Sequence, residues 1–137
     1  MTQWAQSLIR ISTYEVETLQ KRLAEITSRR VSVEMRMAVL DAEAEVERSR
    51  AEIDAHGAMA LSSYLKGYQS RRTSLDADLS EIDTEEEGAR DALNAAFAEL
   101  KKFEHVAEQS RLHELAARSR REAAAMDETA SRRRAAL

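Results

Sequence analysis

Apolar residues recur along this chain at spacings that alternate between three and four, and this repeat limits the fold more than any other feature. A repeat of this kind lays one narrow apolar stripe along a helix, which is typical of two-helix packing. We call these positions the seam. In the first half they are Val16, Leu19, Leu23, Ile26, Arg30, Val33, Met37, Leu40, Ala44, Glu47 and Ala51. In the second half they are Leu61, Leu65, Tyr68, Arg72, Leu75, Leu79, Ile82, Glu86, Ala89, Leu93, Ala96, Leu100, Phe103 and Ala107.

The composition favours helices that run almost without interruption. The 137 residues include no Pro and three Gly, whereas an ordinary domain carries roughly 5% Pro and 7% Gly. Aromatic residues make up 4% of the chain, too few to fill a wide globular core. We therefore expect an all-α rod. The absence of Cys excludes a disulfide framework and thiolate metal sites.

One short stretch between the two halves of the seam is suited to reverse the chain. The segment DAHGAMA contains Gly57, and Gly adopts the left-handed conformation of helix ends and turns without steric cost. The sequence predicts one coiled-coil domain over residues 1–137. Within it we expect a helix over about 3–54, a turn over about 55–60 and a second helix over about 61–134.

An antiparallel hairpin explains the charged residues of the seam. The alignment that pairs Leu40 with Leu79 also brings Glu47 opposite Arg72, and it sets Arg30 one layer from Glu86. A parallel homodimer would instead place each Arg30 against its copy. The sequence therefore favours a monomeric antiparallel hairpin, with a register one heptad away as an alternative.

The second helix is longer than the first, so its C-terminal part has no partner in the hairpin. Residues from about 119 onward overhang, and if helical they extend roughly 28 Å. Residues 111–137 hold seven arginines against four acidic residues, a balance of +3 that leaves −7 for the rest of a chain with net charge −4. Because duplex binding needs a sustained cationic face, we expect no nucleic-acid partner.

Catalytic and metal-binding patterns are missing from the sequence. His105 and His113 are too far apart on a helix to share a metal. The run Glu85-Glu86-Glu87 fits solvated helix faces, since residues at i+1 and i+2 do not share a face. Two helices also offer no deep substrate pocket. We expect a protein that is not an enzyme and needs no cofactor. Without an apolar run of the ~18 residues that a membrane span needs, we also expect it to be cytosolic.

Two clusters remain as candidate recognition surfaces. The first lies near the hairpin tip in YLKGY and comprises Tyr64, Leu65 and Tyr68, where Tyr64 sits beside the seam. Tyr is enriched at interfaces because it combines an apolar body with a polar edge. The second lies on the overhang, where a single Met is an adaptable apolar anchor among charges. Its residues are Arg118, Arg121, Glu122, Met126, Asp127 and Glu128.

Several segments resemble one protein family. The tip segment SSYLKGY, the segment LDADLSEID and the long run FAELKKFEHVAEQSRLHELAARSRREAAAMDETA resemble the FliJ family of flagellar type III export proteins. The pieces KKFE and MDE carry most of this likeness, which covers nearly the whole chain in length and layout. The resemblance implies a central stalk for a hexameric export ATPase, with the terminal end of the coiled coil set in the pore of the ring.

The resemblance also implies partners and their sites. Arg118, Arg121, Glu122, Met126, Asp127 and Glu128 would face the ATPase ring, whereas Tyr64, Leu65 and Tyr68 would lie near the surface offered to the membrane export gate. The family also handles export chaperones and works at the base of the flagellum, peripheral to the inner membrane. Two alternatives stay open. One is the equivalent stalk of a virulence injectisome, and the other is a structural adaptor or chaperone that binds through its tip.

Overall fold

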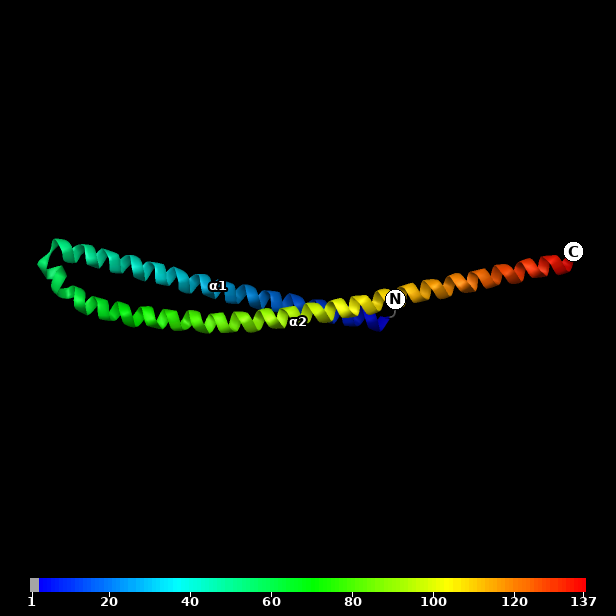
Figure 1. Cartoon of the computed structure of the whole chain (residues 1–137), viewed down its shortest axis with the longest axis horizontal. Coiled ribbons are helices and arrows are strands. Elements are labelled where there is room, and N and C mark those ends of the chain that lie inside the picture. Colours follow the sequence, from blue (N-terminus) through cyan, green and yellow to red (C-terminus); the bar gives the residue numbers. More distant parts are fainter. Residues whose placement is uncertain (1–2) are drawn as a thin grey trace. The chain divides into compact units, whose positions relative to one another are not determined.

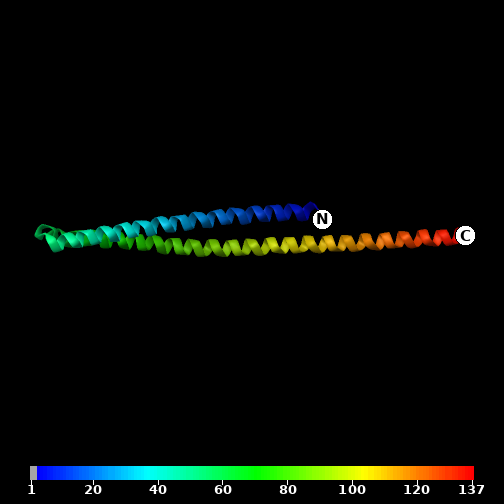
Figure 2. The same cartoon turned by 90° about the horizontal axis from the view of Figure 1, so that it is seen from above.

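A computed structural model describes residues 3–137, and two long helices account for nearly all of them. Helix α1 spans Gln3–Ile53 and helix α2 spans Ala55–Ala136, with no strand in this described range. Figures 1 and 2 show the two helices side by side and running in opposite directions. The predicted all-α antiparallel hairpin is therefore confirmed.

The break between the helices is a single residue, Asp54. Its carboxylate Oδ1 accepts a hydrogen bond of 3.1 Å from the backbone N–H of His56, so Asp54 caps the N-terminus of α2. The expected turn over about 55–60 differs from this, because those residues already belong to α2. Asp54 provides the local signal for the break, since a side chain that satisfies the free N–H groups lets the next helix begin at once.

Gly57 has a different role from the one that its position suggests. No residue in the described range 3–137 has a positive φ, so Gly57 is not in the left-handed conformation. A Cβ atom placed on Gly57 would lie 3.0 Å from the backbone oxygen of Arg50 and 3.2 Å from its carbonyl carbon. The missing side chain therefore allows the start of α2 to approach the end of α1 closely.

The contacts of the chain divide it into two units. The first comprises the residues up to Glu17 together with Asn94–Leu137, and the second comprises Thr18–Leu93. Each unit contains part of α1 and part of α2.

The seam forms the core of the second unit. Ile26, Val33, Met37, Ile82 and Ala89 make one buried cluster. Leu23, Leu75 and Leu79 pack against it. Every predicted seam residue between Thr18 and Leu93 is buried or half-buried. Full burial of such a side chain stabilises the fold by about 1.5–3 kcal/mol, so the seam is the main stabilising feature of this unit.

Ion pairs beside the seam join the two helices. The Arg30 guanidinium donates from Nε to Glu86 Oε2 at 3.0 Å and also pairs with Asp83, while Arg29 pairs with Glu85. The expected meeting of Arg30 with Glu86 is therefore confirmed. Two members of the acidic run, expected on solvated faces, are tied to the other helix because long arginine side chains reach across the seam.

One charged pair departs from the expected alignment. Arg72 donates to Asp41 Oδ2 at 2.9 Å rather than meeting Glu47, and Glu47 pairs within α1 with Arg50. The pairing of Glu47 with Arg72 is therefore wrong. The reason is that Asp41 lies beside the seam and has a short side chain that the longer Arg72 can reach, whereas Glu47 has a nearer partner one turn along its own helix.

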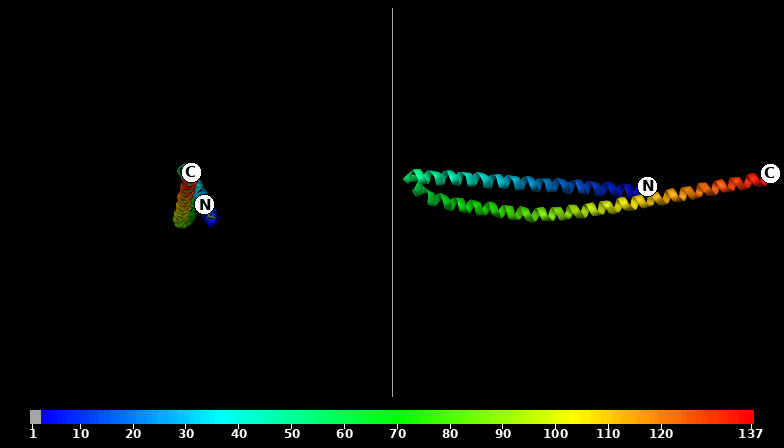
Figure 3. Two further views of the ribbon diagram at one scale, coloured as in Figure 1. Left: turned by 90° about the vertical axis from the view of Figure 1, so that its right-hand side faces the viewer. Right: turned by 45° about the horizontal axis from the view of Figure 1, so that its top comes forward.

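The first unit packs through small side chains and then leaves α2 alone. Ala5, Ser12 and Val16 of α1 are buried, as are Ala96 and Ala107 of α2. Beyond Ala117, every residue of α2 is exposed although the helix continues to Ala136. Figure 3 shows α2 extending beyond the N-terminal end of α1. We call residues 118–136 the tail, and its exposure agrees with the predicted overhang.

Candidate partner-binding surfaces

The tail is a helix whose side chains have no packing partner within the described chain. Met126 is 74% exposed, which is unusual for the only large apolar residue among these charges. The hydrogen bonds that tail side chains form join neighbouring turns of the same helix. Arg132 Nη2 donates to Glu128 Oε1 at 2.7 Å, and the Thr129 hydroxyl donates to the Ala125 carbonyl oxygen at 2.9 Å. Such exposed pairs stabilise a helix only slightly, so the surface of the tail is free to bind a partner.

The six candidate residues of the tail do not form a single face. Arg118, Glu122 and Met126 are spaced by four and therefore lie along one face. Arg121 and Glu128 are seven apart and lie along the adjoining face, beside Arg132. Asp127 belongs to neither. A partner that surrounds the helix could contact all six, whereas a partner on one side would miss at least Asp127.

The C-terminal end of the tail is basic. Arg133 and Arg134 occupy the last turn of α2, where the unpaired carbonyl groups carry partial negative charge. These cations therefore stabilise the helix end as well as presenting positive charge to a partner. An acidic surface would complement this end of the chain.

Tyr68, at the tip, is engaged inside the hairpin. Its hydroxyl donates to Asp41 Oδ1 at 2.6 Å, and the guanidinium carbon of Arg48 lies 6.0 Å from the ring centroid. The hydrogen bond to Asp41, and then burial, raise the pKa of Tyr68 and keep the hydroxyl protonated as a donor. Arg72 holds the other oxygen of Asp41. Tyr68 is thus half-buried and positioned by α1.

The two other tip residues are also only partly accessible. Tyr64 and Leu65 are half-buried, and the hydroxyl of Tyr64 is buried without a hydrogen-bond partner in the described chain. An unsatisfied buried hydroxyl costs free energy, which a partner or a small local movement could recover. Leu65 lines a shallow surface hollow with Leu61 and Lys66. The tip therefore presents partly covered side chains rather than whole aromatic rings.

A third surface lies on α1, and the sequence reasoning missed it. Val31, Met35, Val39 and Val46 are 49%, 64%, 56% and 52% exposed, and Ala42 lies between them. Their spacings of three and four place them on one face, which we call the outer face of α1. The signal was present as a second periodic stripe, offset from the seam.

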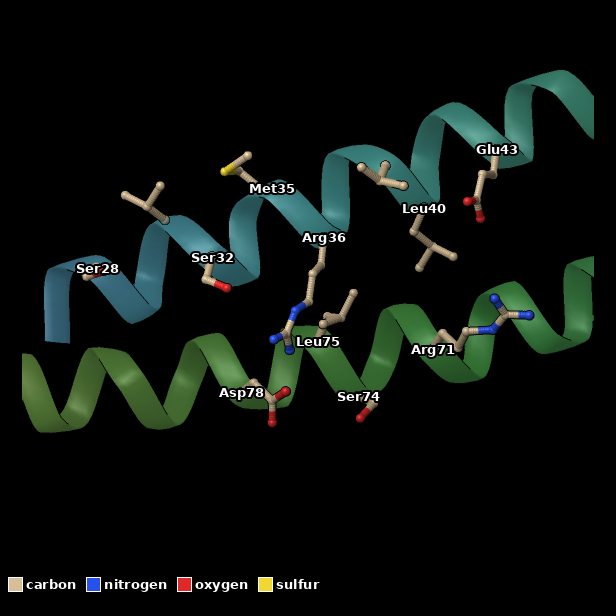
Figure 4. Close-up of a pocket in the computed structure, with 12 residues that line it drawn as sticks. Ser28, Ser32, Met35, Arg36, Leu40, Glu43, Arg71, Ser74, Leu75 and Asp78 are labelled. Carbon is tan, nitrogen blue, oxygen red and sulfur yellow. The ribbon is translucent and has the colours of Figure 1, made fainter. Parts of the chain in front are cut away.

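The outer face borders a groove between the helices of the second unit. The groove has a volume of ≈ 840 Å³, and Leu40 and Leu75 line it together with Arg36 and Arg71. In Figure 4, Met35 projects away from α2, whereas Arg36 points toward α2. The outer face and the groove together give this unit an apolar surface with charged edges.

Comparison with known proteins assigns the family. Residues 5–136 match the family described as Flagellar FliJ protein. The chain belongs to the FliJ family. It is 52% identical over 135 residues to Flagellar FliJ proteins from two strains of Caulobacter vibrioides, covering 98% of this chain and 97% of each relative. No solved structure matches the chain.

Membership of the FliJ family agrees with the resemblance seen in the sequence. The match extends over both helices and includes the tail, so the exposed helix is part of the region shared with the family. Within residues 3–137, neither helix contains a stretch long and apolar enough to cross a membrane.

Proposed function

We propose that this member of the FliJ family is a non-enzymatic stalk of the flagellar type III export apparatus, whose tail binds and stimulates the hexameric export ATPase. The observation that carries the proposal is the tail, which stays helical over 118–136 with every side chain exposed. A partner that encloses this helix would contact both of its charged faces and Met126. The flagellar family membership supports the flagellar system over a virulence injectisome.

Stimulation requires more than binding. A helix inside a ring of ATPase subunits changes their turnover only if it contacts one conformational state more favourably than another. The tail has the asymmetry for this, because Arg118, Glu122 and Met126 lie on one face while Arg121 and Glu128 lie on another. Subunits around the ring would therefore meet different chemical surfaces at the same time.

The turnover of the purified export ATPase tests the role of the tail. We expect the full chain to raise turnover and a chain ending at Ala117 to have no effect, because the shortened chain keeps the packed residues and loses the exposed ones. Circular dichroism would establish that the shortened chain remains helical. Equal stimulation by both chains would exclude the tail as the activating element.

Met126 offers a sharper test with a matched control. Met126→Ala removes the exposed apolar anchor and should weaken stimulation several-fold, since buried apolar anchors dominate interface energetics. Met59→Ala changes another strongly exposed Met, 83% accessible, at the other end of α2 and should leave stimulation unchanged. A matching loss in both variants would show that the effect is not specific to the tail.

The proposal includes a link from the ring to the membrane export gate and to export chaperones, which places the chain in the cytoplasm at the inner membrane beneath the flagellum. The tip residues Tyr64, Leu65 and Tyr68 are the proposed contact. The partly exposed Tyr64, with its unsatisfied hydroxyl, supports this site. Tyr64→Phe should weaken capture of the gate protein, and Tyr64→Ala should weaken it further. Met59→Ala should leave capture unchanged.

Variants at the tip and the tail also distinguish the stalk function from the alternative function as an adaptor or chaperone. A stalk loses ATPase stimulation when the tail is removed and keeps it when Tyr64 is changed. An adaptor that acts only through its tip shows the reverse dependence in motility assays, failing with Tyr64→Ala and tolerating removal of the tail. Measuring both readouts on both variants therefore distinguishes the two functions.

A further inference from the structure

The middle of α1 carries apolar residues on two opposite sides, and α2 covers only one of them. Val33, Met37 and Leu40 are buried in the seam. The outer face, with Met35 and Val39 about half or more exposed, has no cover in the described chain. A surface helix needs one apolar stripe, so a second stripe that continues for several turns is typical of an interaction site.

Two charges on one edge of the outer face also lack partners. Arg36 and Glu43 are seven residues apart and therefore lie on the same edge of α1. Neither forms an ion pair or a side-chain hydrogen bond in the part of the chain that the structure describes, whereas the nearby Arg29 and Arg30 are paired. The outer face thus has an unpaired cation toward one end and an unpaired anion toward the other.

We propose that the outer face binds a second copy of this chain in antiparallel orientation, centred near Val39. Such a copy brings Val31 against Val46 and the large Met35 against the small Ala42. In an antiparallel pair related by a twofold axis, the same edges of the two helices meet. Arg36 of each copy then lies near Glu43 of the other, which satisfies four charges with two symmetric ion pairs.

The charges select this arrangement over its alternatives. A parallel twofold pair would instead place this edge against the opposite edge of the other copy, so Arg36 and Glu43 would not meet each other and both charges would stay unpaired. The seam cannot serve as the interface, since α2 fills it within one chain. The expected monomer follows from that filled seam, whereas this dimer uses a separate surface. A patch of a few valines and one Met is small for an interface, so the dimer is weak and concentration-dependent.

This inference goes beyond the proposed function, because the outer face and the tail belong to different units of the chain. Removing the tail should leave dimerisation unchanged, and disrupting the outer face should leave the tail intact. The two proposals can therefore fail independently. If the dimer is lost in a chain ending at Ala117, the outer face is not its interface and the inference is overturned.

Sedimentation velocity of the full chain, from micromolar to near-millimolar concentration, tests the dimer. We expect a dimer fraction that rises with concentration and a dissociation constant that increases about tenfold or more in Val39→Glu. Val106→Glu places the same charge at an exposed valine of α2 and should not change the dimer. Melting temperatures of both variants would exclude unfolding as the cause. A chain that stays monomeric at every concentration would overturn the proposal.

A charge exchange tests the orientation. Arg36→Glu should weaken the dimer, because it places two anions together at each symmetric pair. The double variant Arg36→Glu with Glu43→Arg restores opposite charges only in the antiparallel arrangement, so dimerisation should recover. Failure of the double variant to exceed the single variant would contradict the proposed contacts.

The absence of Cys from the chain allows a direct check of the centre of the interface. Val39→Cys should form disulfide-linked dimers quickly under mild oxidation, since the two copies meet at this residue. Ser70→Cys, at an exposed position of α2, is the matched control and should cross-link only slowly. Equal rates at the two positions would mean that random collisions account for the product, and the proposed interface would be rejected.

Discussion

At the scale of single residues, the hairpin depends on acid groups that are held charged by arginines of both helices. Hydrogen bonds from Arg90 and then Arg30 lower the pKa of Glu86 below its ordinary value of 4.5. The hydrogen bond from Arg29 likewise lowers the pKa of Glu85. The pairs with Arg29 and Arg30 join α2 to α1 beside the seam, so the protonation state of both carboxylates is coupled to folding.

The sign of the resulting pH dependence follows from the direction of the shifts. Because both pKa values are depressed in the folded chain, the stabilisation is fully present above the unfolded value of about 4.5 and is lost as the pH falls through the lower folded values. We expect the free energy of unfolding, measured by denaturant titration, to decrease between about pH 5 and pH 3. The variant Glu85→Gln with Glu86→Gln should show a flatter dependence in this range.

Glu87 provides the control for the pH experiment. It belongs to the same acidic run, but its carboxylate makes no ion pair in the described part of the chain. Glu87→Gln should keep the pH dependence of the unmodified protein. If the double variant and Glu87→Gln behaved alike, the ion pairs with Arg29, Arg30 and Arg90 would not be the source of the effect.

Among the elements, α2 contains glycines that differ in what surrounds them. The same substitution to Ala is therefore expected to have opposite effects on the stability of the hairpin. A Cβ at Gly88 would meet nothing within 4 Å, and a Cβ at Gly57 would press on the backbone of Arg50 at 3.0 Å. Gly88→Ala should therefore stabilise the hairpin by about 0.5–1 kcal/mol through helix propensity. Gly57→Ala should give no gain and should destabilise by a similar amount, because backbone atoms cannot move aside easily.

Thermal and denaturant unfolding of the two variants would measure this difference. Gly67→Ala is a third member of the series, since its nearest neighbour would be the flexible end of Arg71 at 3.8 Å, and it should resemble Gly88→Ala. A stabilising Gly57→Ala would mean that the approach of α2 to α1 at the break is looser than described. The expected order of stability is thus Gly88 and Gly67 variants above the unmodified chain, and the Gly57 variant below it.

The elements also show which features a sequence can predict and which it cannot. The three-four repeat identified the seam, because burial of one stripe is required by any pairing of two helices, and Ile26, Val33 and Ile82 are buried as expected. The break at Asp54 was placed too late, since attention to Gly57 favoured a left-handed turn over a capping carboxylate. The partner of Arg72 depends on side-chain reach, which periodicity does not determine.

The candidate sites were predictable to a smaller extent. The exposed tail followed from the unequal helix lengths, because residues without a partner across the hairpin cannot be buried. The position of Tyr68 on the seam predicted its half-burial, whereas its hydrogen bond to Asp41 and its contact with Arg48 depend on side-chain reach and were not foreseen. The outer face of α1 was missed because Val31 and Val39 belong to a second stripe that is explained only once α2 is seen to cover the first.

At the scale of the whole molecule, the stalk proposal requires that the tip and the tail be held apart by a fixed length of coiled coil. This requirement can be tested without altering either proposed site. Adding one heptad to each helix between Thr18 and Leu93 preserves the seam, since a seven-residue insertion keeps apolar positions on the same face. It lengthens this unit by about 10 Å.

The lengthened chain should stay folded and should still stimulate the export ATPase, because the tail and the seam are unchanged. Motility should fall, since a tail held in the ring would place the tip about 10 Å from its contact at the gate. Swimming in soft agar and ATPase turnover are the two measurements. As a control, inserting two residues into α1 alone rotates its apolar face by about 200°, away from α2, and should lower the melting temperature. Full motility with the symmetric insertion would show that the spacing of tip and tail is not used, and the role as a link between ring and gate would have to be given up while activation by the tail could stand.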